Sequence, residues 1–434
     1  MNSCQIKPKE ATSIINSLVS GVVPKTGLQH ITVGRSGEIE AFIKALEDVR
    51  SGQSIMKFWI GEFGSGKSFM LHLMNTVALK QKFIVASADF TPDTRLYSND
   101  GKSVALYKEI MNNLSIQTKP EGGALPILLE KWIEYILVKT AQEKQIPLDQ
   151  IRDIQYANYI SRNINSLINN ISNVGGFDFG LVVQKYYEGY LLDDEEMKKN
   201  CLKWLKGEYT TKTEAKRDLG VREIIDDQNY YDMLKNFSGF FTSIGYNGLV
   251  INLDEAINLY KISIPSVREK NYEKLLTIYN DCFQGRVTNI MFNIAGTNAV
   301  LENERRGFYS YRALKTRLET NKYETTLIRD FSQPVIRLFP LSHNEIFVLL
   351  NKLLNIFDFH YNCQSNIETE DIRKFMEEIY NKPGANEFLT PREVIRDFLN
   401  ILNILRQNPN LDKKALFSKI IITDERDDNQ VEEL

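Results

Sequence analysis

The octapeptide GEFGSGKS at residues 61–68 restricts the fold more than any other stretch of this chain. A compact apolar run of strand length, residues 55–60, precedes it, and apolar residues at helical spacing follow it from Phe69 to Leu79. The octapeptide satisfies G-x-x-x-x-G-K-[ST], and a strand before it with a helix after it is the context in which that pattern binds phosphate. The sequence therefore predicts an α/β fold built on a parallel sheet.

Each residue type in the octapeptide suits a phosphate ligand. Gly64 and Gly66 allow backbone N–H groups to turn toward a β-phosphate, Lys67 reaches the β- and γ-phosphates, and Ser68 places its hydroxyl on Mg²⁺. The sequence therefore predicts ATP and Mg²⁺ as ligands. The expected nucleotide-binding residues here are Gly61, Phe63, Gly64, Ser65, Gly66, Lys67, Ser68 and Phe69.

Two adjacent carboxylates, Asp254 and Glu255, follow a second apolar run at residues 248–253. The carboxyl end of a buried strand is the usual ligand crevice of an open α/β sheet. We expect Asp254 to bind Mg²⁺ and Glu255 to polarise the attacking water as the catalytic residue. An Asp-Glu pair also occurs at strand ends as a helix cap, and its combination with Lys67 favours the catalytic interpretation.

Polar residues also follow the next apolar run, residues 289–295. Thr297 and Asn298 stand where side chains could contact a γ-phosphate or the water that attacks it, although both residue types are ordinary turn formers. Downstream, a charged segment with expected helical structure carries four arginines, most of which are solvated in segments of this kind. These are Arg305, Arg306, Arg312 and Arg317.

The chain is too long for one hydrophobic core, and its apolar patterns change along its length. Further strands are expected at residues 83–90 and 335–339, and helices at 125–141, 159–171, 179–192, 195–206, 230–244, 344–357, 368–380 and 391–405. The expected domains are an N-terminal helix and lead-in at 1–30, the first part of an ATPase core at 31–120, a helical insert at 121–244, the second part of the core at 245–340, and a helical lid with an acidic tail at 341–434.

Composition excludes several classes of protein. The four cysteines are scattered and form no zinc or disulfide pattern, and no apolar run is long enough to span a membrane. The first nine residues lack the pattern of a secretory signal, so a cytoplasmic protein is expected. Residues 198–222 hold eight basic residues against three acidic ones, which indicates either a solvated helical face or a surface for nucleic acid or a partner.

Taken together, these features resemble an AAA+ ATPase. The chain is similar, more narrowly, to the P-loop ATP-binding proteins of BREX-type anti-phage operons, which are related to the origin-recognition branch of AAA+. The segments that carry the resemblance are VPKTGLQHITVGR (23–35), KFWIGEFGSGKS (57–68), KWLKGEY (203–209), GYNGLVINLDEA (245–256), AGTNAVLENERRGFYSYRALKTRL (295–318) and TPREVIRDFLNIL (390–402).

The resemblance implies roles for single residues. Asn298, or its neighbour Thr297, would be sensor 1, and Arg392 would be sensor 2 of a lid helix. Arg317 would be the arginine finger that acts on the ATP of a neighbouring subunit, with Arg306 as the alternative. Two departures limit the comparison: the helical insert is larger than in a minimal AAA+ core, and no winged-helix pattern follows Leu405.

The expected function is an ATPase that serves as a switch or motor in anti-phage defence. Its expected partners are other defence proteins, such as a helicase. DNA is a further expected partner, bound directly or through those proteins. Homo-oligomers are expected if an arginine finger acts on a neighbouring subunit. One alternative is a nucleotide-gated scaffold with negligible turnover that recruits a helicase or nuclease. Another is an ATPase that selects targets for transposition.

Overall fold

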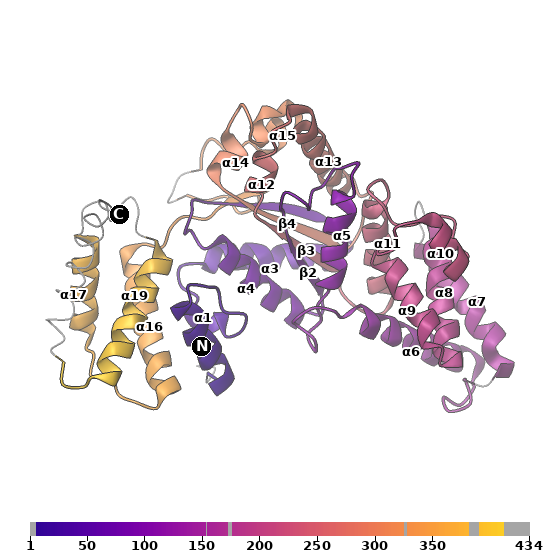
Figure 1. The fold of residues 1–434 in the computed structure, drawn as a ribbon, viewed down its shortest axis with the longest axis horizontal. Coiled ribbons are helices and arrows are strands. Elements are labelled where there is room, and N and C mark those ends of the chain that lie inside the picture. The colour runs from indigo at the N-terminus through magenta and orange to yellow at the C-terminus, as the bar shows by residue number, and fades with distance from the viewer. Residues whose placement is uncertain (1–5, 153, 172–175, 325–327, 382–389, 412–434) are drawn as a thin grey trace, which may run out of the picture. The chain divides into compact units, whose positions relative to one another are not determined.

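The computed structural model describes residues 6–152, 154–171, 176–324, 328–381 and 390–411. The predicted acidic tail lies outside these residues. Two compact units are present: residues 1–39, 61–73 and 337–434 form the first, and residues 40–60 and 74–336 form the second. Figure 1 labels the elements along the chain.

The second unit contains the sheet. Its strands are β1 (Ile55–Ile60), β2 (Ile84–Asp89), β3 (Leu249–Asp254), β4 (Ile290–Gly296) and β5 (Val335–Arg337), in the spatial order β2-β3-β4-β1-β5. The pairs β2–β3, β3–β4 and β1–β4 are parallel. β1 and β4 are buried along their full length, as expected for parallel strands covered on both faces. The expectation of a parallel α/β sheet is therefore confirmed.

A chain of side-chain hydrogen bonds crosses the middle of this sheet. Trp59 Nε1 donates to Asn293 Oδ1 at 3.0 Å, and Asn293 Nδ2 donates to Asn252 Oδ1 at 2.7 Å. Asn252 Nδ2 donates to Asn75 Oδ1, whose own Nδ2 donates to Ser87 Oγ at 3.0 Å. Buried amides are costly unless they are paired, so this chain fixes the lateral register of β1, β4, β3 and β2. It also attaches the second half of helix α4 (Lys67–Lys80) to the sheet.

Helices account for the rest of the second unit. They are the long helix α3 (Ser36–Arg50), most of which belongs here, α5 (Lys102–Asn112), α6 (Leu125–Lys144), α7 (Ala157–Ile171), α8 (Gly176–Leu192), α9 (Glu195–Leu205), α10 (Lys212–Leu219), α11 (Tyr230–Ser243), α12 (Ile257–Tyr260), α13 (Pro265–Phe283), α14 (Asn298–Glu302) and α15 (Arg312–Leu318). Short 3-10 turns lie at Ile154–Tyr156 and Phe308–Ser310.

The helices between β2 and β3 share one hydrophobic core with the sheet. Aromatic rings join the helices α6, α8 and α11: the Trp132 and Phe240 centroids are 5.5 Å apart, and those of Phe179 and Phe237 are 5.2 Å apart. Aromatic side chains bury more apolar area than any others, so these contacts contribute strongly to the stability of the helical cluster. The insert helices visible in Figure 1 therefore form one body with the sheet and not a loosely tethered module.

The first unit brings the two ends of the chain together. Helix α1 (Pro8–Val19) packs on α16 (His343–Tyr361) and α19 (Pro391–Gln407), with α2 (Leu28–Ile31) and α17 (Thr369–Tyr380) beside α16. The buried face of α1 is formed by Ala11, Ile14 and Ile15, which recur at helical spacing. Capping boxes begin α16 at Ser342 and α19 at Thr390, where the side-chain oxygen accepts a backbone N–H and a glutamate returns the bond.

Most predicted elements are confirmed within a few residues, and two expectations need correction. The helix α13 was not predicted, because its buried face includes Arg268, Asn271 and Asp281, which the apolar pattern assigns to solvent. The segment with four arginines was expected to be helical throughout. Arg305 and Arg306 instead lie in a turn after α14, since Asn303 Oδ1 accepts both of their backbone N–H groups at 3.0 Å.

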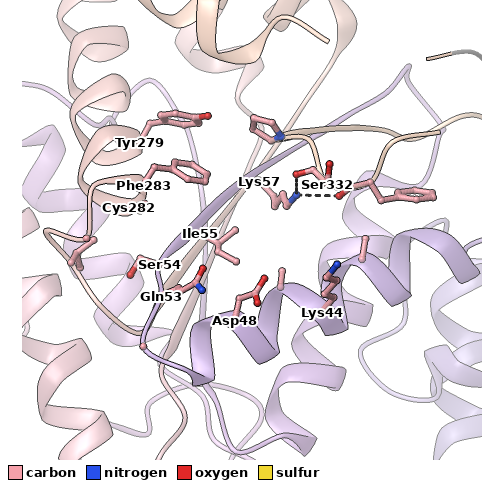
Figure 2. Close-up of a pocket in the computed structure, with 17 residues that line it drawn as sticks. Lys44, Asp48, Gln53, Ser54, Ile55, Lys57, Tyr279, Cys282, Phe283 and Ser332 are labelled. Carbon is pink, nitrogen blue, oxygen red and sulfur yellow. Dashed lines mark hydrogen bonds between the residues drawn. The ribbon is translucent and has the colours of Figure 1, made fainter. Parts of the chain in front are cut away.

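Lys57, in the middle of β1, holds the segment that leads into β5 (Figure 2). Its buried ammonium donates to the carbonyl oxygens of Phe331 and Ser332 at 3.2 and 3.0 Å, as Figure 2 shows. It also donates to the carbonyl oxygen of Gln333 at 2.7 Å. Burial lowers the pKa of Lys57 to about 8, although the negative charge of Asp330 opposes the shift. The edge strand β5 is thus attached to β1 by a lysine as well as by the sheet.

The Lys57→Met variant tests this assignment through pH. Because the folded-state pKa of Lys57 is about 8 and its ordinary value is 10.5, the unfolded chain binds the extra proton between these values. Lys57 therefore makes the free energy of unfolding rise with pH in that window, by up to about 1.4 kcal/mol per pH unit. Urea unfolding from pH 7 to 10.5 should show a steeper rise for wild type than for Lys57→Met. Parallel pH profiles would contradict the assignment.

Candidate functional site

The 61–68 loop belongs to the first unit and leads from β1 into α4. Gly64 and Gly66 have φ angles of +80° and +86°, a region that favours glycine. A Cβ atom on Gly61 would lie 2.4 Å from the carbonyl oxygen of Leu338, so only glycine fits there. Ser65 is buried, and its Oγ makes no hydrogen bond with the described residues. The loop thus has the backbone conformation that its glycine spacing predicts.

Lys67 is the first residue of α4, and its side chain returns to the beginning of its own loop. Its Nζ donates to the carbonyl oxygens of Gly61 and Glu62, both at 2.9 Å, and lies 5.8 Å from the centre of the Phe63 ring. Phe63 itself is 82% exposed. Ser68 and Phe69 continue the first turn of α4, where backbone N–H groups point out of a helix N-terminus and attract anions.

The start of α19 lies against this loop within the same unit. A Cβ on Gly64 would be 3.0 Å from the Cβ of Thr390, and 3.6 Å from the Cδ of Pro391. The next residue, Arg392, is exposed. Its Cδ lies 3.9 Å from the position that a Cβ atom on Gly21 would occupy. The structure therefore places the start of α19, whose second residue is Arg392, next to the predicted phosphate loop.

The carboxylates Asp254 and Glu255 end β3 in the second unit. Asp254 is half-buried, its Oδ1 accepts the backbone N–H of Glu255 at 2.8 Å, and its carbonyl accepts the N–H of Phe90 at 3.0 Å. Glu255 is exposed and has a φ of +57°, which is costly for a residue with a side chain. Six other non-glycine residues among those described share this conformation, so the φ angle alone does not distinguish Glu255 from a turn residue.

Thr297 and Asn298 follow β4, the strand between β3 and β1. Thr297 is the N-cap of the short helix α14, and Asn298 is the first residue of that helix. The register pairs Ile60 with Gly296 and Leu253 with Ile294, so β1, β3 and β4 end at the same edge of the sheet. The second unit therefore gathers Asp254, Glu255, Thr297 and Asn298 at the edge where β1 also ends.

Two further carboxyl groups at this edge were not predicted. Asp89, the last residue of β2, is the register partner of Asp254. Its backbone N–H donates to Glu109 Oε1 at 3.2 Å, and burial, together with the Asp89 charge, raises the pKa of Glu109. The sequence signal available for Asp89 was its place at the end of an apolar strand pattern. Nothing in the sequence around Glu109 indicates that this residue lies beside Asp89.

A magnesium ion would need donors that these residues supply only in part. No group of three or more ligating side chains is arranged to hold a metal among the residues that the structure describes. Mg²⁺ in nucleotide sites takes one or two protein oxygens and completes its shell with phosphates and waters. The hydroxyl of Ser68 in the first unit and the carboxylate of Asp254 in the second are each oxygen donors of the kind that such an ion takes.

The arginines have different surroundings. Exposed Arg317 donates from Nε to Asn280 Oδ1 at 3.0 Å and from Nη1 to the Ala313 carbonyl at 2.9 Å. Arg306 donates to the Ile262 carbonyl at 3.3 Å and lies over the Tyr260 ring. Both arginines therefore bond within the second unit, and they differ in exposure: Arg317 is exposed, whereas Arg306 is half-buried.

Four of the eight basic residues in the stretch 198–222 are paired with carboxylates. Lys198 contacts Glu195, Lys203 contacts Glu214, Lys212 lies 3.8 Å from Glu223, and Arg217 lies 2.9 Å from Asp218. Such pairing is typical of a solvated helical face. This arrangement favours that interpretation of the stretch over a nucleic-acid surface.

The hollow in Figure 2 lies elsewhere in the second unit. It has a volume of ≈ 660 Å³ and is lined by residues of α3, by the start of β1, by the end of α13 and by the segment at 331–334. Ile55, the first residue of β1, is part of its wall. Ligands of open α/β sheets bind beyond the carboxyl ends of the strands, so this hollow is not the candidate nucleotide site.

Comparison with known proteins identifies a family. A protein-family model described as BREX system ATP-binding protein BrxC/D matches residues 6–420. No curated protein matches the chain. Among the helices of the described residues, none has the length and apolar character needed to cross a membrane.

Paired variants of Glu255 test the backbone strain at this edge. Both Glu255→Gly and Glu255→Ala remove the carboxylate, but only glycine adopts a φ of +57° without strain. We expect Glu255→Gly to be more stable than Glu255→Ala by about 1 kcal/mol in urea unfolding. Equal stabilities, or a more stable alanine variant, would show that the left-handed conformation is absent in solution.

Proposed function

Because the chain belongs to the BREX system ATP-binding proteins of the BrxC/D family, we propose that it is an AAA+ type ATPase whose nucleotide site is the 61–68 loop. The observation that carries the proposal is the loop itself: left-handed Gly64 and Gly66 lead directly into the N-terminus of α4, with Lys67 as its first residue. A loop of this kind presents backbone N–H groups and positive partial charge to an anion.

The chemistry follows from the residue types. Lys67 would exchange its contacts with the Gly61 and Glu62 carbonyls for the β- and γ-phosphate oxygens. Ser68 and Asp254 would bind Mg²⁺, which when present neutralises charge on the phosphates. Glu255 would polarise the water that attacks the γ-phosphorus, and Thr297 or Asn298 would orient that water or the γ-phosphate. Phosphoryl transfer requires mainly positioning and charge stabilisation, which this set supplies.

The C-terminal helices would act as a lid. The support for this role is the packing of Thr390 and Pro391 on Gly64, which places the first turn of α19 beside the loop. Arg392 would then reach the γ-phosphate as sensor 2. Replacement of ATP by ADP would remove that contact and change the position of α19, so the nucleotide state would be converted into a change of conformation.

Arg317 would act on a second copy of the chain as an arginine finger. It is exposed at the end of α15, and its present partners, Asn280 and the Ala313 carbonyl, are neutral groups that a phosphate could replace. This role requires at least a dimer in the presence of ATP. Light scattering that finds only monomers of the Glu255→Gln variant with ATP would exclude it.

The biological setting that we propose is anti-phage defence. The family name gives the BREX system and ATP binding. We propose that partner defence proteins, such as a helicase, receive the conformational change and act on DNA. Paired charges along residues 198–222 favour action on DNA through partners over direct binding by that stretch.

Phosphate release by wild type, Lys67→Ala and Glu255→Gln tests the enzymatic proposal. Lys67→Ala should lose ATP binding, because the ammonium no longer neutralises the phosphates. Glu255→Gln should keep ATP binding and lose turnover by about 10²-fold or more, because the water is no longer polarised. Thermal shift with ATP reports binding independently of turnover.

The same variants separate the ATPase from a nucleotide-gated scaffold. A scaffold would bind ATP, release phosphate at a negligible rate, and remain active in recruitment as Glu255→Gln. If wild type, Lys67→Ala and Glu255→Gln released phosphate at comparable rates, the release would come from a contaminating enzyme. That result would contradict the ATPase proposal.

A further inference from the structure

Arg35 contacts the 61–68 loop from outside the octapeptide, and the motif gives no indication of it. The residue is 7% exposed and stands directly before α3. Its Nη2 donates to the carbonyl oxygen of Ser65 at 2.8 Å and to that of Phe339 at 2.7 Å. Its Nη1 lies 3.4 Å from Oε1 of Glu38, which is 2% exposed. One guanidinium therefore joins the loop, the chain segment before α16, and a buried carboxylate.

The bond to Ser65 determines the direction of a neighbouring N–H group. In a trans peptide the carbonyl oxygen and the following N–H lie on opposite sides of one plane, and the described chain contains no cis peptide. Since the Ser65 carbonyl faces Arg35, the N–H of Gly66 faces away from it. Gly66 is the last residue before α4, where the loop N–H groups and the helix N-terminus combine to attract an anion.

The bond to Phe339 connects this peptide to the C-terminal helices. Phe339 lies three residues before Ser342, whose capping box starts α16. The carbonyl oxygen of the neighbouring residue Leu338 packs closely against Gly61: a Cβ atom on Gly61 would lie 2.4 Å from that oxygen. The backbone at residues 338–339 thus contacts the loop at both of these points, once by close packing and once through Arg35.

We propose that Arg35 is a positioning residue of the nucleotide site: it orients the Gly66 N–H toward a bound phosphate and transmits occupancy of the loop to α16. The proposal rests on the proposed function of the loop and adds a residue that acts through the backbone without touching the nucleotide. An arginine suits this role because its planar fork donates in two directions from one nitrogen while its charge remains paired with Glu38.

Arg35→Ala and Arg35→Lys test the role, with Lys352→Ala as the matched control. Lys352 donates to the Thr32 carbonyl at 2.8 Å, so its removal also breaks a bond between a cation and a backbone carbonyl in the first unit, but the carbonyl does not belong to the 61–68 loop. Both alanine variants should unfold at a lower temperature without nucleotide. Only Arg35→Ala should weaken ADP binding in calorimetry, by about tenfold to a hundredfold.

Lysine should restore little of the binding, because it keeps the charge beside Glu38 without the planar fork. Hydrogen exchange gives a second readout: ADP should slow exchange at the amides of α16 in wild type and in Lys352→Ala, and should do so less in Arg35→Lys at saturating ADP. If Arg35→Ala does not fold because Glu38 has lost its partner, the double variant Arg35→Gln/Glu38→Gln takes its place.

Wild-type ADP affinity in the Arg35 variants, or full restoration by lysine, would overturn the positioning role. The proposed function fails separately. If wild type binds no nucleotide, the loop is not a nucleotide site. If wild type binds ADP, Lys67→Ala does not, and Arg35→Ala binds as tightly as wild type, only the role of Arg35 is wrong.

Discussion

Two cations hold the 61–68 loop through its own carbonyl oxygens. Lys67 binds those of Gly61 and Glu62, and Arg35 binds that of Ser65. Because a trans peptide directs its N–H opposite to its carbonyl, the bond from Arg35 to Ser65 also directs the N–H of Gly66 away from Arg35, and the proposed mechanism keeps this bond when Lys67 turns to the phosphates. A loop whose N–H groups are oriented in advance can bind an anion without reorganising its backbone. This constraint links the glycine-rich sequence to the chemistry that we propose.

The edge of the sheet provides the second half of the proposed chemistry. Asp89 and Asp254 end neighbouring strands in register, Glu255 is held in a left-handed conformation, and Thr297 and Asn298 begin the helix after β4. The side-chain amides of Asn252 and Asn293 lie a few residues before these ends and join the strands laterally. The register that they fix decides which polar groups share the edge, so the buried network supports the site without belonging to it.

Much of the fold follows from the sequence because the signals are local. Apolar runs of strand length and helical spacing place the strands and most helices, and the octapeptide identifies the loop. The helix α13 was missed because Arg268 and Asn271 face the interior. The contacts of Arg35 were missed for another reason: its partners Ser65 and Phe339 are 30 and 304 residues away along the chain, and no periodic pattern predicts such pairs. The same limit applies to Glu109 beside Asp89.

The central claim, that the 61–68 loop binds nucleotide through its phosphates, is tested most directly by titrating the intact chain with ATP, ADP and AMP in the presence of Mg²⁺. Lys67 and the loop N–H groups act on the β- and γ-phosphates, so ATP and ADP should bind while AMP binds at least about 100-fold more weakly. Equal affinity for AMP would assign recognition to the adenosine portion and contradict the account. Failure of all three nucleotides to bind at millimolar concentration would contradict it as well.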